Sequence, residues 1–476
     1  MYNSRITIKE LINSEYRNVL VFLCGMLVMV AGMFSTVDIV PELLKSQDLG
    51  VTLLQLINTL PLVILAVMFP LGRIWVQLQS VKKTFQFTLL GFFAGSLIIS
   101  VSSEFDLILL GRVVQSVSCG MLFPMIFSII SALSKSTNVT TSRKKRGIIV
   151  DRAILLATII SIGSLLLGNW QYQEWFFAGV SLITWGFSYK VKFNIQATKY
   201  KVDWHEVALS VGAPILLVWV TSLGIGALPD WVNPLFGGFS LILLVGYIVY
   251  DLTSYQPLSG LRQLIHCQYI THVFTTIIGY GSFLLLLSIG DLYLVQGLHY
   301  STFFTALALL PAIDAFILMK RSDLVIIRRL TVASLTKTGM TILMIGWLLL
   351  SVFSSYLNLI GFIFVSVIIE VGHGLIARHA LNYAVFSLPK ESRYAGTLFF
   401  QQMNLYVPAI ILEIFTVILQ NNTELSMTGS SLPGVLSSLS GYRAVFLSYL
   451  LIVILGWFIT IFDDFKIQIN LKNIFK

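Results

Sequence analysis

Two ionisable side chains one helical turn apart, Glu370 and His373, lie inside a long apolar stretch of this chain. On a helix, residues three positions apart share a face, so the carboxyl and the imidazole are expected to lie together. A carboxyl and an imidazole held away from water are groups that bind and release protons. We therefore expect Glu370 to carry a proton with His373 beside it. The alternative is a helix-packing hydrogen bond from Glu370 to a backbone carbonyl or to Arg378.

Four further ionisable residues lie in other apolar runs, and a charge at membrane depth is costly unless it is paired or hydrated. Arg112 shares a helical face with Gln115, one turn further on. Arg112 is either a functional residue or one that locks two helices through an ion pair. The remaining three are acids, and each is either a coupling residue or a hydrated wall of a cavity: Asp291, Asp314 and Glu413.

Uncharged polar side chains inside apolar runs predict the lining of a substrate cavity. Amides of this kind also bind helices to one another in lipid, which is the alternative. The candidates for the cavity lining are Gln55, Asn58, Gln115, Gln296, Asn382, Gln401, Gln402 and Asn404.

The elements that hold these residues are long apolar segments. Hydrophobic residues make up 56% of the 476 residues and charged residues only 11%, a composition that no soluble domain could cover with polar surface. An apolar helix of about 20 residues crosses a bilayer core about 30 Å thick. We predict an all-α polytopic membrane protein with spans at 19–44, 51–76, 84–103, 105–133, 147–168, 175–190, 205–228, 233–253, 268–297, 301–319, 330–356, 357–386, 393–420 and 442–462.

The cations alternate between the connections of these spans. Of the 31 Lys and Arg residues, 27 fall on the side that carries both chain ends. Positive residues gather on the cytoplasmic side of a membrane protein, so this pattern places both termini in the cytoplasm. The net charge of +9 therefore indicates orientation in a cell membrane and contact with lipid, and it gives no reason to expect a nucleic-acid partner.

The fourteen spans divide into three parts. We expect a six-helix bundle over 1–203, an inserted helical pair over 204–253 and a second six-helix bundle over 254–476. The connections are short, and the longest outer one, about 421–441, is rich in Ser, Gly and Asn and is typical of a mobile cap.

Several stretches resemble the fourteen-helix drug–proton antiporters of the major facilitator superfamily. Gly111–Gln115 resembles the R-x-x-Q-G motif of the fourth helix of that superfamily. Tyr293–Gly297, followed by Leu309–Pro311, is similar to the Y-L-Q and L-L-P run of the antiporters, and Gly372–Gly374 continues the order. The resemblance covers almost the whole chain. It implies two pseudo-symmetric bundles around a central cavity that opens alternately to either side, with Arg112 assisting proton transfer.

Two positions depart from that family pattern. The first helix of the family carries an acid nine residues before a proline, and counting back from Pro41 gives Gly32. The connection after the second helix carries an acid where this chain has Val76. In the second half, Asp323 and Arg328 keep the acid and the base of the corresponding connection. We therefore expect proton coupling, if retained, to lie in the second half of the chain.

The sequence carries no phosphate-binding G-x-x-x-x-G-K-[ST] loop, no H-E-x-x-H pair and no clustered cysteines, so we expect neither an enzyme nor a cofactor or metal site. Our leading hypothesis is a monomeric secondary transporter that exports a small lipophilic compound in exchange for protons. The second is a transporter or flippase for a lipid-linked molecule, a peptide or a metabolite, which the missing acids favour. The third is a membrane scaffold or sensor that no longer transports.

Overall fold

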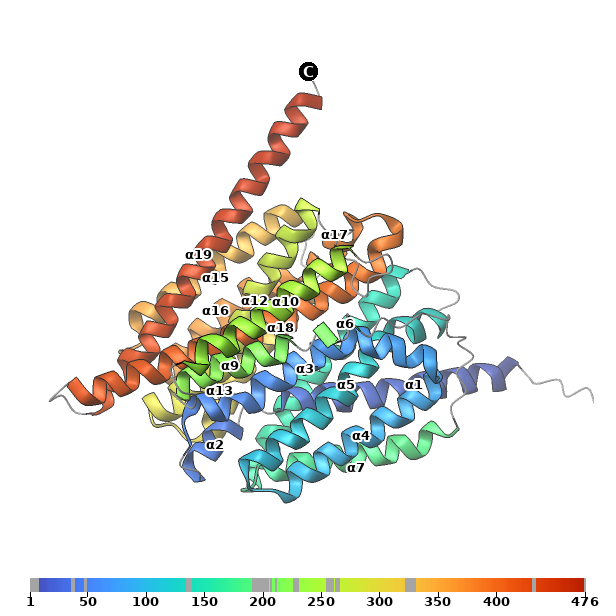
Figure 1. Cartoon of the computed structure of the whole chain (residues 1–476), viewed down its shortest axis with the longest axis horizontal. Coiled ribbons are helices and arrows are strands. Elements are labelled where there is room, and N and C mark those ends of the chain that lie inside the picture. Colours follow the sequence, from blue (N-terminus) through green and yellow to red (C-terminus); the bar gives the residue numbers. More distant parts are fainter. Residues whose placement is uncertain are drawn as a thin grey trace, which may run out of the picture. The chain divides into compact units, whose positions relative to one another are not determined.

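The structure is a computed structural model, and its described residues are almost entirely helical (Figure 1). It describes residues 8–35, 39–46, 49–133, 139–190, 205, 208–209, 212–225, 231–253, 261, 266–321, 331–429 and 434–474. Within these residues, ten helices are long and apolar enough to cross a membrane, and two shorter apolar helical segments lie at Val21–Phe34 and Arg152–Leu166. The prediction of an all-α multi-pass membrane protein is confirmed. The count of fourteen spans stays a prediction.

The chain divides into two compact units, and the first comprises Met1–Thr36 and Val67–Val202. In this unit α4 packs against α5 and α7, and α1 packs against α6 and α7. The helices of the first unit are α1 (Ile8–Phe34), the end of α3 (Val51–Leu78), α4 (Val81–Val101), α5 (Phe105–Leu133), α6 (Val139–Leu166) and α7 (Gln171–Ser188).

The second unit comprises Val37–Ala66 and Asp203–Lys476. Its long helix α18 packs against α9, α12 and α19, while α16 packs between α13 and α15. The unit contains α2 (Ile39–Ser46), the start of α3, α9 (Gly212–Ile225), α10 (Val232–Thr253), α12 (Cys267–Leu292), α13 (Thr302–Arg321), α15 (Val332–Phe353), α16 (Leu359–Ala377), α17 (Ala380–Phe386), α18 (Arg393–Gly429) and α19 (Gly434–Ile474). A π-helical turn at Tyr293–Gly297 extends α12, and a 3₁₀ turn occupies Lys390–Ser392.

Polar caps and glycines fix several helix ends. Ser80 accepts a hydrogen bond from the backbone N–H of Lys83 at the start of α4, and Asn358 accepts one from Gly361 at the start of α16. Gly168, with φ of 83°, adopts the left-handed conformation between α6 and α7, which favours glycine. The predicted span 19–44 is divided into α1 and α2, and Pro41 lies in the first turn of α2, where a missing N–H costs nothing.

The prediction of a mobile cap at 421–441 is wrong for the described residues of this segment, which are helical. Helix α18 continues to Gly429 and α19 begins at Gly434, so the helices extend into this segment from both sides. Composition favoured a loop because Ser, Gly and Asn are common in turns, but long neighbouring helices override such a weak propensity.

Two helix crossings are close enough to require glycine at the contact. A Cβ on Gly95 of α4 would lie 2.7 Å from the carbonyl oxygen of Gly111 in α5, and one on Gly111 would lie 2.8 Å from that of Gly95. The crossing of α15 with α16 repeats this arrangement, since a Cβ on Gly339 or on Gly372 would lie 2.7 Å from the carbonyl oxygen of the other. These paired glycines hold the two backbones together and fix the side chains that follow them.

Candidate functional site

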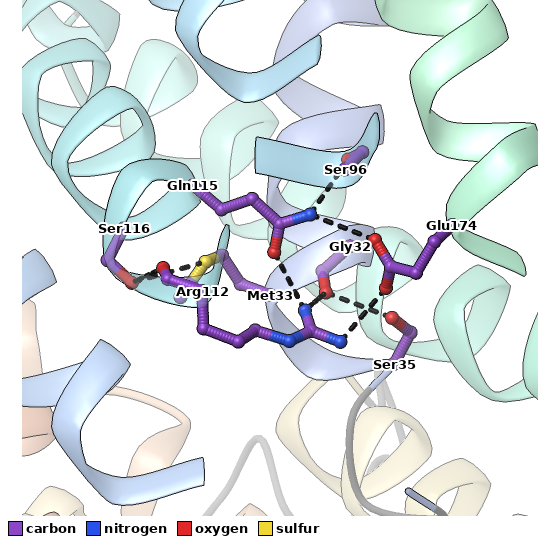
Figure 2. A network of polar contacts seen from close by, with 8 residues as sticks. All are labelled: Gly32, Met33, Ser35, Ser96, Arg112, Gln115, Ser116 and Glu174. Carbon is purple, nitrogen blue, oxygen red and sulfur yellow. Dashed lines mark hydrogen bonds and ion pairs between the residues drawn. The ribbon is translucent and has the colours of Figure 1, made fainter. Parts of the chain in front are cut away.

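The first unit buries an ion pair between Arg112 of α5 and Glu174 of α7 (Figure 2). Arg112 Nη2 lies 2.9 Å from Glu174 Oε1, and both side chains are fully buried. Arg112 Nη1 donates to the carbonyl oxygen of Gly32 at 2.9 Å and to Gln115 Oε1 at 2.8 Å. The guanidinium therefore connects α1, α5 and α7.

Gln115 extends this network as the shared helical face predicts. Its Nε2 donates to Ser96 of α4 at 2.7 Å and to Glu174 Oε2 at 2.9 Å. Each carboxylate oxygen of Glu174 thus accepts a hydrogen bond, one of them from a cation. Of the two interpretations of Arg112, the geometry favours an ion pair that locks helices.

Glu174 is a site residue that the sequence analysis does not single out. It lies in the first turn of α7, one residue before the predicted span at 175–190, and so falls in a predicted connection. A signal for it existed: Arg112 inside an apolar helix requires a counter-charge, and an acid at the adjoining end of another helix can supply one.

Gly32, where the resemblance implies an acid, could carry a side chain only if Phe92 shifted. A Cβ there would lie 2.5 Å from Cζ of Phe92, which is itself fully buried in α4. The carbonyl of Gly32 accepts from Ser35 at 2.9 Å as well as from Arg112. The first helix therefore contributes a backbone oxygen to the arginine, and the carboxylate comes from α7.

The second unit buries Glu370 and His373 together, as the sequence predicts. Glu370 Oε2 lies 2.9 Å from His373 Nδ1, and both side chains are fully buried in α16. The alternative partner Arg378 instead donates to His379 Nε2 at 3.1 Å and to the carbonyl oxygen of Met319 at 3.4 Å. The geometry thus joins the carboxyl to the imidazole.

Aromatic rings enclose this pair. The ring of Phe316 in α13 stacks on His373 with a centroid distance of 4.3 Å, and Tyr280 of α12 meets the imidazole edge-on at 4.9 Å. Lys320 Nζ lies 4.9 Å from the centroid of Phe316, on the helix that carries this ring. The opposite atoms of the pair, Glu370 Oε1 and His373 Nε2, have no hydrogen-bond partner among the described residues. The pair therefore retains polar capacity for a proton or a hydrogen-bonding ligand.

The two buried pairs occupy corresponding places in their units. Arg112 directly follows Gly111, and His373 directly follows Gly372, the glycines of the two close helix crossings. Each cationic or potentially cationic side chain then bonds to a buried glutamate. The pairs differ in two respects. Arg112 and Glu174 join two helices whereas Glu370 and His373 lie on one, and a guanidinium is permanently charged whereas an imidazole titrates.

Glu413 of α18 is the third buried glutamate among the described residues. Its Oε2 accepts from the hydroxyl of Thr59 in α3 at 2.8 Å, and its Oε1 accepts from that of Thr221 in α9 at 2.9 Å. Both threonines and the carboxyl are buried. Sequence reasoning named Glu413 and missed both threonines, since contacts 354 and 192 residues apart have no local signal.

The other two candidate acids differ from each other in burial. Asp291 is fully buried near the end of α12. The hydroxyl of Tyr442 in α19 donates to Gln296 Oε1 at 3.2 Å, which places Gln296 beside α19. Asp314 is exposed on α13, on the same helical face as Phe304, Leu307 and Leu318, which are also exposed.

The remaining residues predicted to line a substrate cavity differ in burial and in hydrogen bonding. Gln55 and Asn58 are buried on α3 beside Thr59, and their amides have no hydrogen-bond partner among the described residues. Asn404 donates to the carbonyl oxygen of Phe400 at 2.8 Å within its own helix. Asn382, Gln401 and Gln402 are partly buried. Asp323 and Arg328 lie outside the described residues. No cluster of three metal-ligating side chains occurs in the described part of the chain.

Known proteins provide an independent comparison. The sequence matches no protein-family model. It is 22% identical over 307 residues to the lincomycin resistance protein LmrB of Bacillus subtilis, covering 63% of this chain and 64% of that protein. It is also 26% identical over 176 residues to a triacylglyceride transporter of Mycobacteroides abscessus, covering 35% and 33%. The matches thus span less than two thirds of either relative.

The fold is also found among solved transporters. The crystal structure of PepTSo, a POT family transporter, aligns with a TM-score of 0.66 over 95% of this chain and 98% of that one, at 13% sequence identity. Identity at this level indicates a shared fold and says nothing about substrate.

Proposed function

We propose that this diverged member of the major facilitator superfamily exports a small lipophilic compound in exchange for protons, by alternating access. A multi-pass helical fold shared with transporters and a sequence relative named for lincomycin resistance support export of such a compound. The proposal includes a monomer in the cell membrane with both termini in the cytoplasm, and a bundle–pair–bundle order of six, two and six spans.

The buried contact between Glu370 and His373 is the main support for proton coupling. The two groups lie 2.9 Å apart, fully buried, and aromatic rings surround them. Such a pair is neutral overall when it holds one proton between its two groups, and it becomes cationic when it takes up a second. A change of one charge in a buried site alters the relative energy of two conformations, which is what coupling requires.

The Arg112–Glu174 pair has the complementary role in this proposal. Its arginine keeps its charge, and its carboxylate accepts hydrogen bonds from Arg112 and from Gln115. We assign it to holding the first unit together during the cycle. Coupling is thereby concentrated in the second unit, with Asp291, Asp314 and Glu413 as further acids there.

Transport by the purified protein in proteoliposomes tests the proposal. Vesicles are loaded with ethidium or with lincomycin, and the efflux rate is measured with and without an acidic exterior. Protons entering down their gradient are expected to accelerate efflux through the protein. Equal rates with and without the gradient, for both probes, would contradict proton antiport.

Two matched variants test whether Glu370 is the residue that couples proton movement to efflux. Glu370→Gln removes an acid while keeping the shape of the side chain, and we expect it to abolish the acceleration by the gradient. Asp106→Asn makes the same chemical change at an exposed position in the first turn of α5, and we expect wild-type behaviour. A gradient response that survives in Glu370→Gln would remove this residue from the coupling step.

A second candidate function is transport of a lipid-like molecule. The relative named a triacylglyceride transporter favours it, as does the glycine in place of the first-helix acid. The same vesicles with a fluorescent triacylglycerol in one leaflet distinguish the two. Movement of this lipid between leaflets, without efflux of ethidium or lincomycin, would favour the second candidate.

A further inference from the structure

Glu413 differs from the other two buried glutamates because hydroxyl groups, and no cation, hold it. Thr59 and Thr221 each bond to one of its carboxyl oxygens, at 2.8 and 2.9 Å. Within the described residues no Lys, Arg or His forms an ion pair with it. The site therefore binds a carboxyl group through donors whose protons can rotate.

Each threonine hydroxyl also lies close to a second acceptor. Thr59 Oγ1 is 3.2 Å from the carbonyl oxygen of Gln55, and Thr221 Oγ1 is 3.1 Å from that of Leu217. A hydroxyl has one proton to donate and can accept at the same time. Each threonine can thus donate either to Glu413 or back to its own helix, with no movement of heavy atoms.

These alternatives satisfy both protonation states of the carboxyl. The carboxylate accepts from both hydroxyls. The protonated carboxyl donates its own O–H to one threonine, whose proton turns to the carbonyl four residues earlier, while the other threonine continues to donate. Because neither state leaves a buried polar group without a partner, a proton can be bound and released here without disrupting the packing.

Charged and titratable groups also lie on the elements around Glu413. Helix α18 itself carries Tyr406 two turns earlier, and the 3₁₀ turn that packs on α18 carries Lys390 and Glu391. Helix α9 and residues 51–66 of α3 contain no ionisable side chain. Helices α12, α17 and α19 pack against α18, and their ionisable side chains on the described residues up to 461 are Cys267, Tyr269, His272, Tyr280, Asp291, Tyr383, Tyr442, Arg443 and Tyr449. The hydrogen bonds of Glu413 go to the two threonines, so its protonation acts first on α3 and α9.

We propose that Glu413, Thr59 and Thr221 form a second proton-binding site, and that the two threonines are its positioning residues. This inference rests on the proposed proton antiport and extends it to α9. That helix lies in the segment predicted as an inserted pair, and Thr221 gives it a direct part in coupling. Protonation of Glu413 exchanges the hydrogen bonds that hold α3 and α9 to α18.

Infrared titration of the purified full-length protein tests the site without a known substrate. The carbonyl stretch of a protonated carboxylic acid is followed as pH is raised, and the part that disappears in Glu413→Gln is assigned to this residue. In Thr221→Val and Thr59→Val the carboxylate loses a donor, so we expect the protonated band to persist to a pH about one unit higher.

Thr416→Val is the matched control. Thr416 is a buried threonine of α18 whose hydroxyl donates to the carbonyl oxygen of Leu412 at 2.8 Å, and the change is expected to leave the titration as in the wild type. Thr221→Ser keeps the hydroxyl and is expected to restore the wild-type titration. A Glu413 band that titrates identically in Thr221→Val and in the wild type would overturn the proposal.

Transport separates failure of this site from failure of the proposed function. The site takes part in coupling if the proton gradient accelerates efflux by the wild type and this acceleration is at least about tenfold smaller in the Thr59→Val/Thr221→Val double variant. If the wild type responds and the double variant responds equally, the second site is refuted and the antiport proposal stands. If the wild type does not respond at all, the antiport proposal fails, and the infrared result decides the site on its own.

Discussion

Arg112 donates a hydrogen bond to the carbonyl oxygen of Gly32, at 2.9 Å. Gly32 is the position at which the resemblance to drug–proton antiporters leads one to expect an acid. The ring of Phe92 occupies the space that such a side chain needs, and Glu174 places its carboxylate against the guanidinium from α7. The arginine therefore has a carboxylate partner although the first helix provides none.

Removing the charge of Glu174 is expected to destabilise the first unit. Glu174→Gln leaves a buried guanidinium without its counter-ion, and breaking a buried pair in this way costs about 3–5 kcal/mol. The temperature of unfolding in detergent micelles should fall clearly below that of the wild type. An unchanged unfolding temperature would show that Arg112 does not depend on this carboxylate.

The double variant Arg112→Met/Glu174→Met is the corresponding control. It removes both charges and fills a similar volume with flexible apolar side chains, and such replacements are often neutral for stability. We expect it to unfold at a higher temperature than Glu174→Gln. A double variant less stable than the single one would assign the loss to shape and hydrogen bonding rather than to the unpaired charge.

The contact between Gly32 and Phe92 predicts a size limit at position 32. Gly32→Ala places a methyl group where Phe92 Cζ lies 2.5 Å away, and overpacking of this kind costs about 1–3 kcal/mol. Combining Gly32→Ala with Phe92→Ala should add less destabilisation than the two changes summed. Fully additive losses, measured as unfolding temperatures in a double-mutant cycle, would mean that the two side chains do not compete for one space.

The close crossings predict a low tolerance for side chains at Gly111 and Gly372. An added Cβ at either residue meets a backbone carbonyl that cannot turn away, so Gly111→Ala and Gly372→Ala should each destabilise by about 1–3 kcal/mol. Gly179→Ala on α7 is the control, since nothing lies within 4 Å of a Cβ there. This control should match or slightly exceed the wild-type unfolding temperature, because alanine favours helix over glycine. Equal stability of all three variants would argue against the crossings.

His373→Phe should separate packing from proton chemistry in the second unit. Phenylalanine keeps an aromatic ring against Phe316, so the free energy of unfolding is expected to fall only by the cost of the hydrogen bond lost by Glu370, about 1–3 kcal/mol. Glu370 loses its only hydrogen-bonding partner among the described residues, and an isolated buried carboxyl becomes neutral by retaining a proton. Gradient-driven efflux should therefore fall strongly. Efflux at the wild-type rate would show that the imidazole is dispensable.

Local patterns made part of the site predictable from sequence. Gln115 follows Arg112 by one helical turn, His373 follows Glu370 by the same spacing, and the structure joins both pairs by hydrogen bonds. These contacts occur within single helices, so helical periodicity alone places the partners together. The apolar runs likewise predicted a multi-pass helical protein, because an apolar run of about 20 residues crosses a bilayer as a helix that satisfies its own backbone hydrogen bonds.

Only the tertiary structure decided which distant residues complete each buried acid or base. Glu174 reaches Arg112 across 62 residues, and Thr221 reaches Glu413 across 192. The sequence around each of these two residues does not identify it as a partner. A threonine or a glutamate in a helix has the same neighbours in sequence whether its side chain faces solvent or a buried group. The sequence determined that ionisable groups lie within apolar, membrane-spanning helices. Helix packing, fixed by glycine contacts many residues apart, determined which groups compensate them, because hydrogen bonds depend on distance in space and not along the chain.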